Sequence, residues 1–283
     1  MWQRYFKGLL RIRFETHHTK CGQCLNHRLI IKKLGHNPAA QRSQRKELDK
    51  HLKRQHEDRQ VYYLARARSR LDASNLCPMQ VTAILDSMDQ AKHSWPRSQS
   101  MHAKCFSTFN RPRMIQTTMI CHGHGVVMVL SPHYVSANSS RTCEIIAGTI
   151  TMLQRERRLD MRNVVLAIQG DNSSKELKNM SSLRLLALNI ALKQLKAAEA
   201  SFLCSGHSHE DVDAFFAVAR KWLDKSRELW VPEAFRASLE QFLDDPQVRP
   251  FERFRKVVMM SQYRDWKLTC NCCLLYYISP LFM

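Results

Sequence analysis

The order of apolar runs constrains the fold of this chain more than any other feature of its sequence. Three short runs typical of β-strands come first, and strand-like and helix-like stretches alternate after them. We expect strands at 81–85, 113–121 and 124–131, a helix at 141–157, a strand at 163–169, a helix at 175–196, a strand at 200–204 and a helix at 210–225. Such an order favours an α/β domain built on one mixed sheet.

Acidic residues stand at the ends of three of these predicted strands. Asp86 follows the first strand, Asp171 follows the fourth, and the segment Gly206–Asp213 after the fifth packs together two histidines and three acids. Ligands of open α/β sheets bind at the carboxyl ends of strands. Each acid alone also has a simpler explanation, because Asp and Asn favour turns and helix caps and acids favour the first turn of a helix.

A common site for these acids would require a cation. Converging carboxylates repel one another unless a positive charge lies among them, and hard divalent cations prefer oxygen ligands. Two Mg²⁺ or Mn²⁺ ions on such a site can activate a nucleophile and stabilise a leaving oxygen in phosphodiester chemistry.

The order of elements resembles the ribonuclease-H-like fold, which underlies many integrases and transposases. In that superfamily the first catalytic acid lies on strand one, the second just after strand four, and the third on the helix after strand five. The resemblance implies catalytic and metal-binding roles for Asp86 (or Asp89), for Asp171, and for one of Glu210, Asp211 and Asp213. The chemistry of histidine also makes His207 a candidate metal ligand or proton carrier.

Three longer motifs resemble an uncharacterised eukaryotic domain family that looks transposon-derived. They are Met-Asp-Gln-Ala-Lys at 88–92, Asp-Asn followed by Lys-Glu-Leu-Lys-Asn at 171–179, and Gly-His-Ser-His-Glu-Asp-Val-Asp at 206–213. The similarity covers most of residues 15–226 and implies no established activity.

Two other classes of metal hydrolase share a fragment of the third motif. His207-x-His209-x-Asp211 fits the first ligands of metallo-β-lactamase-like enzymes, but no histidine follows His209. Gly-His-x-His is similar to a late metallophosphoesterase motif, but residues 172–205 lack the histidine of the Gly-Asn-His segment that this family needs. Neither class fits the chain.

The charge of the chain indicates an anionic partner. The formal net charge is +19, and residues 1–80 hold 18 of the 44 Lys and Arg residues against 6 of the 25 Asp and Glu residues. Nucleic acid, expected to be DNA, is the commonest partner of such proteins. No window reaches the ~18 apolar residues of a membrane span, and the ten scattered cysteines fit a reducing compartment. We therefore expect an intracellular, nuclear protein without a membrane partner; self-association as a homo-oligomer stays open.

A basic helical module is expected ahead of the sheet. Cys21 and Cys24, in a loop, have the spacing of two zinc ligands, and His51 and His56 on a helical stretch at 41–71 offer a second pair. The alternative is two unremarkable thiols, and other nearby histidines compete as ligands. One basic face is predicted on the helical stretch to contact phosphates, formed by Lys46, Lys50, Lys53, Arg54, Arg59, Arg66, Arg68 and Arg70.

These observations divide the chain into a basic module at 15–78 with a zinc knuckle, a ribonuclease-H-like domain at 79–227 and a helical extension at 228–283. The predicted function is transposase- or integrase-like cleavage or strand transfer of nucleic acid with two divalent metals. The alternative is a catalytically inactive, transposon-derived protein that binds nucleic acid or a protein partner. Ser173 and Ser174, where integrases carry a glycine, keep that alternative open.

Overall fold

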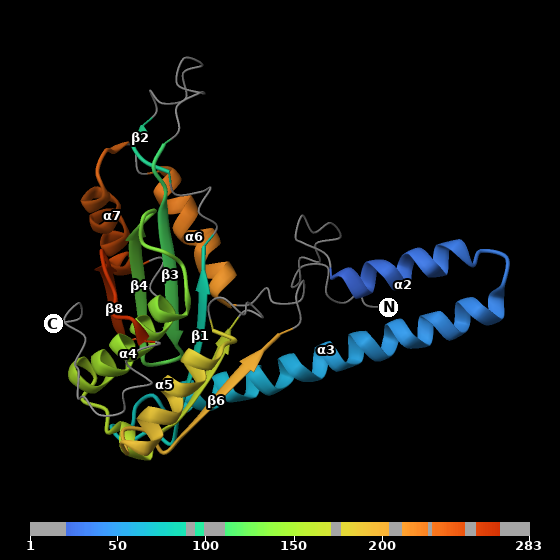
Figure 1. The fold of residues 1–283 in the computed structure, drawn as a ribbon, viewed down its shortest axis with the longest axis horizontal. Coiled ribbons are helices and arrows are strands. Elements are labelled where there is room, and N and C mark those ends of the chain that lie inside the picture. Colours follow the sequence, from blue (N-terminus) through green and yellow to red (C-terminus); the bar gives the residue numbers. More distant parts are fainter. Residues whose placement is uncertain are drawn as a thin grey trace.

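The computed structural model describes residues 21–88, 94–98, 111–170, 177–203, 211–225, 228–246 and 253–266. A mixed sheet forms its centre, with strand order β6-β5-β1-β3-β4-β8 (Figure 1). The strands are β1 (Gln80–Ser87), β3 (Met114–Cys121), β4 (Gly125–Pro132), β5 (Val165–Gly170), β6 (Ala197–Phe202) and β8 (Phe254–Met259). Two shorter strands, β2 (Arg97–Ser98) and β7 (Glu228–Leu229), pair with each other outside this sheet.

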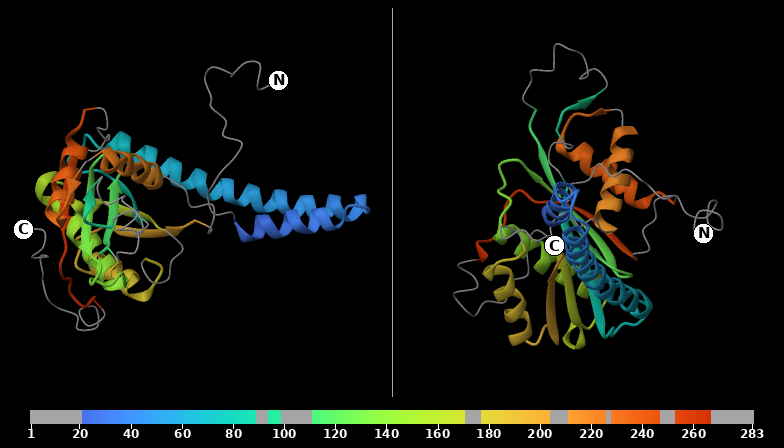
Figure 2. Two further views of the ribbon diagram at one scale, coloured as in Figure 1. Left: turned by 90° about the horizontal axis from the view of Figure 1, so that it is seen from above. Right: turned by 90° about the vertical axis from the view of Figure 1, so that its right-hand side faces the viewer.

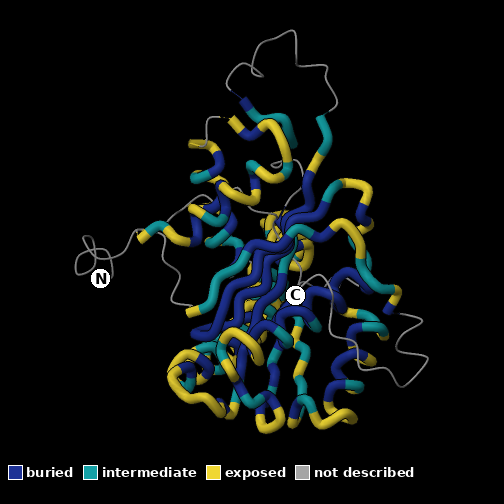
Figure 3. Tube along the Cα trace, turned by 90° about the vertical axis from the view of Figure 1, so that its left-hand side faces the viewer, coloured by how far each residue is buried: buried dark blue, intermediate teal, exposed yellow. Residues whose placement is uncertain are grey.

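The strand directions confirm the predicted fold class. β1, β3 and β4 are antiparallel neighbours, whereas β5 and β6 add to the other side of β1 as parallel strands. Three antiparallel strands followed by two parallel ones, with β1 in the middle, form the ribonuclease-H-like arrangement. β1 and β3–β4 are almost wholly buried because helices cover both faces, as the dark blue strands of Figure 3 show.

Two hydrophobic clusters lie on opposite faces of the sheet. On one face α4 (Ser139–Glu156) and α5 (Met180–Ala191) pack through residues such as Ile146, Leu153 and Leu186. On the other face α6 (Asp211–Lys225) and α7 (Pro232–Asp244) pack through residues such as Phe216 and Phe242. β1 alternates between the two clusters, since Leu85 belongs to the first and Ile84 to the second.

A helical hairpin extends away from the sheet. It consists of α2 (Gly22–Lys33) and α3 (Pro38–Asp72), and α3 is about 52 Å long at ~1.5 Å per residue. Figures 1 and 2 show that only the carboxyl-terminal part of α3 reaches the sheet, while α2 lies along its far part. The predicted helix at 41–71 is therefore one helix, and it begins earlier because Asn37 caps it, accepting a hydrogen bond from the Ala40 backbone N–H, with Pro38 in the first turn.

The turn between β3 and β4 fixes the end of α3. Gly123 has a φ of +80°, and a Cβ placed there would lie 2.7 Å from the Ala73 Cβ and 3.0 Å from the Arg70 Cα. Ser69 donates a hydrogen bond to the backbone carbonyl of His122 at 2.8 Å, and its hydroxyl accepts one from the Thr82 backbone N–H at 3.0 Å. A glycine is needed at this close approach of helix and turn.

The expected helical extension at 228–283 differs from the structure. α7 is helical, but residues 254–259 form β8, which pairs in parallel with β4 at the edge of the sheet. Arg255 and Lys256 interrupt the apolar pattern of this strand, and charges of that kind are common on edge strands. Among the described residues, no helix combines the length and the apolar character needed to cross a membrane.

Candidate functional site

Asp86 lies near the carboxyl end of the central strand. It is the last residue but one of β1, is half-buried, and accepts a hydrogen bond from the Ser87 backbone N–H at 2.8 Å. Its partner across the antiparallel ladder is Thr118 on β3. Paired residues of antiparallel strands point to the same side, so Asp86 and Thr118 share the face that carries α6 and α7.

Buried polar atoms without a described partner surround Asp86 on β3. Gln116 and Thr118 are completely buried, and neither the Gln116 side-chain amide nor the Thr118 hydroxyl has a hydrogen-bond partner in the described part of the chain. Gln116 lies two residues from Thr118 on the same face and is thus a diagonal neighbour of Asp86. Because buried polar groups are nearly always hydrogen-bonded, we expect these atoms to pair with a ligand or with a group outside the described residues.

A buried arginine lies at the same edge on the opposite face. Arg141, in the first turn of α4, donates to the Thr117 hydroxyl at 2.9 Å and to the Ser87 hydroxyl at 3.4 Å. It is 1 % exposed, and its backbone N–H is capped by the Asn138 side chain. Arg141 was not among the predicted site residues, because its only signal in the sequence is a basic residue near the start of a predicted helix.

The end of β5 reaches the same edge. Its last residue, Gly170, is the parallel partner of Leu85, the residue before Asp86. A Cβ on Gly170 would lie 2.2 Å from a methyl group of Leu177, so the glycine lets this buried leucine pack against the strand. Asp171, which follows Gly170 directly, lies outside the described residues, as do Asp89, His207 and Glu210.

Asp211 is held by the helical hairpin. It is the first residue of α6, and Arg66 of α3 donates to its two carboxylate oxygens at 2.5 and 2.6 Å. The Tyr62 hydroxyl lies 3.5 Å from Asp211 Oδ2 and 2.7 Å from His122 Nε2. These four residues form what we call the Asp211 cluster.

Electrostatics explain why the Asp211 cluster is stable as an ion pair beside a neutral imidazole. Burial lowers the pKa of His122 to about 3, although the Asp211 charge acts in the opposite direction. Burial also acts to lower the pKa of Arg66, but the hydrogen bond and charge of Asp211 raise it above its ordinary value. At neutral pH, Arg66 is therefore the cation that pairs with Asp211.

His122 anchors the Asp211 cluster toward the start of β1, whereas Asp86 lies near the end of the strand. The His122 backbone N–H donates to the Thr82 carbonyl, and Thr82 lies four residues before Asp86. Four residues of a strand span about 13 Å. Asp213 lies two residues after Asp211 on α6, about 200° around the helix, so the two carboxylates leave α6 on nearly opposite sides.

The predicted zinc ligands come together in part. Cys21, Cys24 and His51 offer ligand atoms that all lie within 4.8 Å of one another, and we call these residues the Cys-Cys-His group. Cys21 caps α2 and Cys24 lies in its first turn, so the pair stands at the start of a helix and not in the expected loop. Burial raises the pKa of the Cys24 thiol, and Cys21 adds to the shift. His56 is exposed and does not join the group, because five residues along α3 turn it about 140° away from His51.

The predicted basic face of α3 divides into two. At about 3.6 residues per turn, five of its side chains form an exposed stripe and Arg59, Arg66 and Arg70 project from another side. Arg66 is occupied by Asp211, and within the stripe Lys50 and Lys53 each approach a glutamate on the same helix. The stripe consists of Lys46, Lys50, Lys53, Arg54 and Arg68.

A family model described as "Domain of unknown function (DUF7869)" matches residues 112–274, more than half of the chain. The chain belongs to this family. The DUF7869 match begins just before β3 and runs beyond β8, so it includes Arg141, Asp171 and the Gly206–Asp213 motif but leaves out β1 and the helical hairpin. No curated protein matches the chain.

Among solved structures, the chain is similar to two described as "Crystal structure of a pre-cleavage Mos1 transpososome" and "Mos1 transposase paired-end complex with left transposon end". Both are 12% identical. The match to the first has a TM-score of 0.30 and covers 85% of this chain and 82% of that one. The match to the second has a TM-score of 0.33 and covers 89% of this chain and 86% of that one. The fold is assigned from the order and directions of the strands in the sheet. Matches with such low TM-scores do not contribute to it.

Proposed function

We infer that the edge of the sheet at the end of β1 is a divalent-metal site for the cleavage or transfer of nucleic-acid phosphodiesters. The observation that carries this inference is the register of the two central parallel strands. Gly170, which precedes Asp171, pairs with Leu85, which precedes Asp86. Two acids far apart in the sequence thus follow paired residues at the carboxyl ends of adjacent strands, where α/β sheets bind ligands.

The residues around Asp86 fit a hydrated cation. Gln116 and Thr118 present buried oxygen and nitrogen atoms that have no partner among the described residues. Carboxylate, amide and water oxygens are the ligands that Mg²⁺ and Mn²⁺ prefer. Asp86 and Asp171 would hold the metal, which would supply Lewis-acid activation of a water or 3′-hydroxyl and stabilise the leaving oxygen.

The third acid in this proposal is Glu210 or Asp213. Asp211 is less suited to the role because Arg66 already neutralises its carboxylate. Arg141, buried beside Ser87 on the opposite face, supplies a fixed positive charge at the same edge of the sheet. His207 stays a predicted ligand or proton carrier.

The exposed stripe of α3 is the part of the proposal that concerns DNA. Lysine and arginine side chains bind phosphates without reading sequence, and their contribution weakens as salt rises. Because α3 projects from the sheet, its stripe would position DNA at a distance from the Asp86 edge (Figure 1). A nuclear location follows from this partner.

Purified protein incubated with Mn²⁺ and labelled duplex DNA tests the catalytic proposal. We expect metal-dependent cleavage that Asp86→Asn and Asp171→Asn each lower by more than about 100-fold, since even the partners of metal ligands cost 10–100-fold. Glu199→Gln is the matched control, because Glu199 is an exposed acid on β6 of the same sheet. Cleavage that survives both aspartate changes would refute the site.

A second function is binding of nucleic acid without catalysis. It is favoured because Asp211, one of the predicted catalytic acids, is paired with Arg66. The same preparations distinguish the two functions. Binding with a steep salt dependence, no cleavage with Mn²⁺, and no effect of Asp86→Asn would support the binding protein and reject the nuclease.

A further inference from the structure

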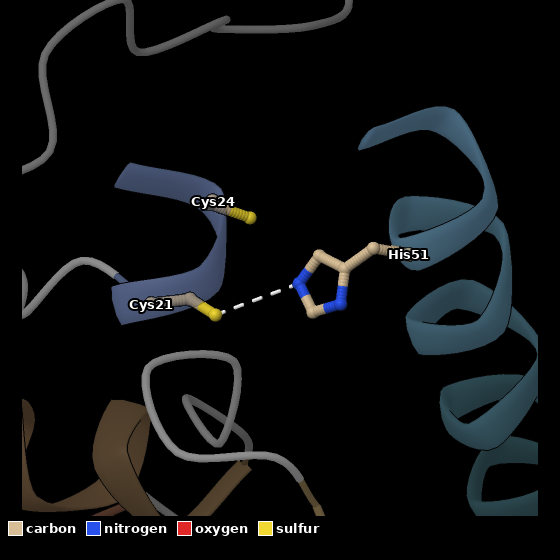
Figure 4. A group of neighbouring side chains, drawn as sticks. All are labelled: Cys21, Cys24 and His51. Carbon is tan, nitrogen blue, oxygen red and sulfur yellow. Dashed lines mark hydrogen bonds between the residues drawn. The ribbon is translucent and has the colours of Figure 1, made fainter. Parts of the chain in front are cut away.

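The Cys-Cys-His group joins two helices that meet from opposite directions. Cys21 and Cys24 come from the start of α2 and His51 from the middle of α3, and their side chains point toward one another (Figure 4). Cys21 Sγ and His51 Nε2 are 3.5 Å apart. Both cysteines are buried, although α2 lies on the outer part of the molecule.

The separation of Cys21 Sγ and His51 Nε2 fits a shared tetrahedral ion. Zn–S distances of about 2.3 Å and Zn–N distances of about 2.0–2.1 Å, at a tetrahedral angle, place a sulfur and a nitrogen ligand about 3.5 Å apart. A thiolate pair with an imidazole is also the ligand set that zinc prefers. A disulfide between Cys21 and Cys24 would give His51 no role in the group.

The far part of the helical hairpin buries few side chains completely. The one buried residue of α2 is Cys24, and α3 buries no residue before Gln55. Leu25 and Leu29 of α2 are 39% and 57% exposed. Two polar contacts also join the helices: Gln41 donates to the Ile31 carbonyl at 3.2 Å, and Gln44 lies 2.5 Å from His27.

We propose that Cys21, Cys24 and His51 bind one Zn²⁺ ion, which fastens α2 to α3. Small structures without an apolar core depend on such a crosslink, and the free energy of metal binding then becomes free energy of folding. The ion closes the 26 residues between Cys24 and His51 and holds α2 against α3. This zinc site is independent of the proposed nuclease activity, so either proposal can fail without the other.

Cobalt substitution of the full-length, reduced protein tests the zinc site. We expect one Co²⁺ per chain with a thiolate-to-cobalt charge-transfer absorption, which one equivalent of Zn²⁺ removes. Cys21→Ser, Cys24→Ser and His51→Ala should each lose this absorption. His56→Ala and Cys77→Ser are matched controls that should keep it, because His56 is an exposed histidine of the same helix and Cys77 an exposed cysteine.

Thiol protection in the unmodified chain provides a readout that does not depend on variants folding. With Zn²⁺ present, alkylation of Cys21 and Cys24 should slow at least tenfold while Cys77 reacts at the same rate, and a chelator should reverse the effect. Equal alkylation with and without Zn²⁺ would overturn the proposal. Loss of cobalt binding in His56→Ala as large as in His51→Ala would overturn the ligand assignment.

Discussion

Replacing Asp211 by asparagine separates a structural role of this acid from a catalytic one. In the structure its carboxylate accepts two short hydrogen bonds from Arg66, with side chains 31% and 24% exposed. Asp211→Asn keeps the shape of the side chain but leaves the Arg66 guanidinium without its counter-charge.

The size of the effect follows from this partial burial. Exposed ion pairs contribute about 0–1 kcal/mol, and breaking a fully buried pair costs about 3–5 kcal/mol. Hydrogen bonds to charged groups contribute about 1.5–3 kcal/mol, which is the range we expect for Asp211→Asn. For a domain of this size such a loss lowers the melting temperature by about 3–10 °C.

The assay combines urea or thermal unfolding with DNA cleavage in Mn²⁺. We expect Asp211→Asn to unfold earlier but to retain cleavage within roughly threefold of the unmodified chain, since a side chain that contacts neither metal nor substrate leaves the barrier nearly unchanged. A cycle with Arg66→Gln should give a coupling energy of about 1–3 kcal/mol. Asp244→Asn, at the exposed end of α7, is the control.

Two results would refute the structural role of Asp211. An Asp211→Asn protein of unchanged stability that has lost cleavage would make Asp211 a metal ligand and its contact with Arg66 incidental. A coupling energy near zero would mean that Arg66 and Asp211 do not stabilise each other. Either result would return Asp211 to the position of third acid.

Three further predictions concern the packing of the domain. Gly123→Ala should lower the free energy of unfolding by about 2–4 kcal/mol, because the new Cβ would meet Ala73 and the φ of +80° disfavours alanine. If denaturant unfolding shows no loss of stability, the docking of α3 against this turn is wrong. Burial lowers the pKa of His122 to about 3 and that of His124 to about 4, so the unfolded chain, with histidine pKa values near 6.5, takes up protons first as the pH falls. Stability should therefore fall between pH 7 and pH 5, by about 1–2 kcal/mol for each histidine, and a flat profile in unfolding experiments would show that these imidazoles are solvated. Glu144→Gln should lower the free energy of unfolding by about 2–4 kcal/mol and raise proteolysis near residue 264. The reason is that the buried carboxylate of Glu144 accepts hydrogen bonds from the Arg264 guanidinium and the Trp266 indole. An unchanged cleavage pattern in limited proteolysis would argue against the docking of residues 264–266 on α4.

The positions of most strands could be predicted because apolar runs determine which segments become strands. β1, β3, β4 and β5 lie within two residues of their predicted positions, since each is a buried run with a polar end. β8 was missed for the opposite reason. An edge strand tolerates charges such as Arg255 and Lys256, which hide its alternation, and its pairing with β4 is a long-range contact that local sequence does not encode.

The Cys-Cys-His group shows what spacing can and cannot predict. The Cys-x-x-Cys spacing identified the two sulfur atoms, because residues three apart meet on one turn. The choice between His51 and His56 depends on the rotational position of α3 against α2, which the spacing of the residues does not encode. A sequence pattern that assigns both histidines to one helix face is inconsistent with about 3.6 residues per turn.

The same rotational argument limits the choice of the third acid. Arg66 was expected to contact phosphate, but its position on α3 turns it toward α6, where it pairs with Asp211. Asp211 and Asp213 leave α6 on nearly opposite sides. Because Asp211 points toward α3, Asp213 points away from it. Comparing Asp213→Asn with a Glu210→Gln protein in the cleavage assay therefore decides the third position, and we expect one of the two to match the loss caused by Asp86→Asn. Full activity in both would leave Asp86 and Asp171 as the only acids of the site.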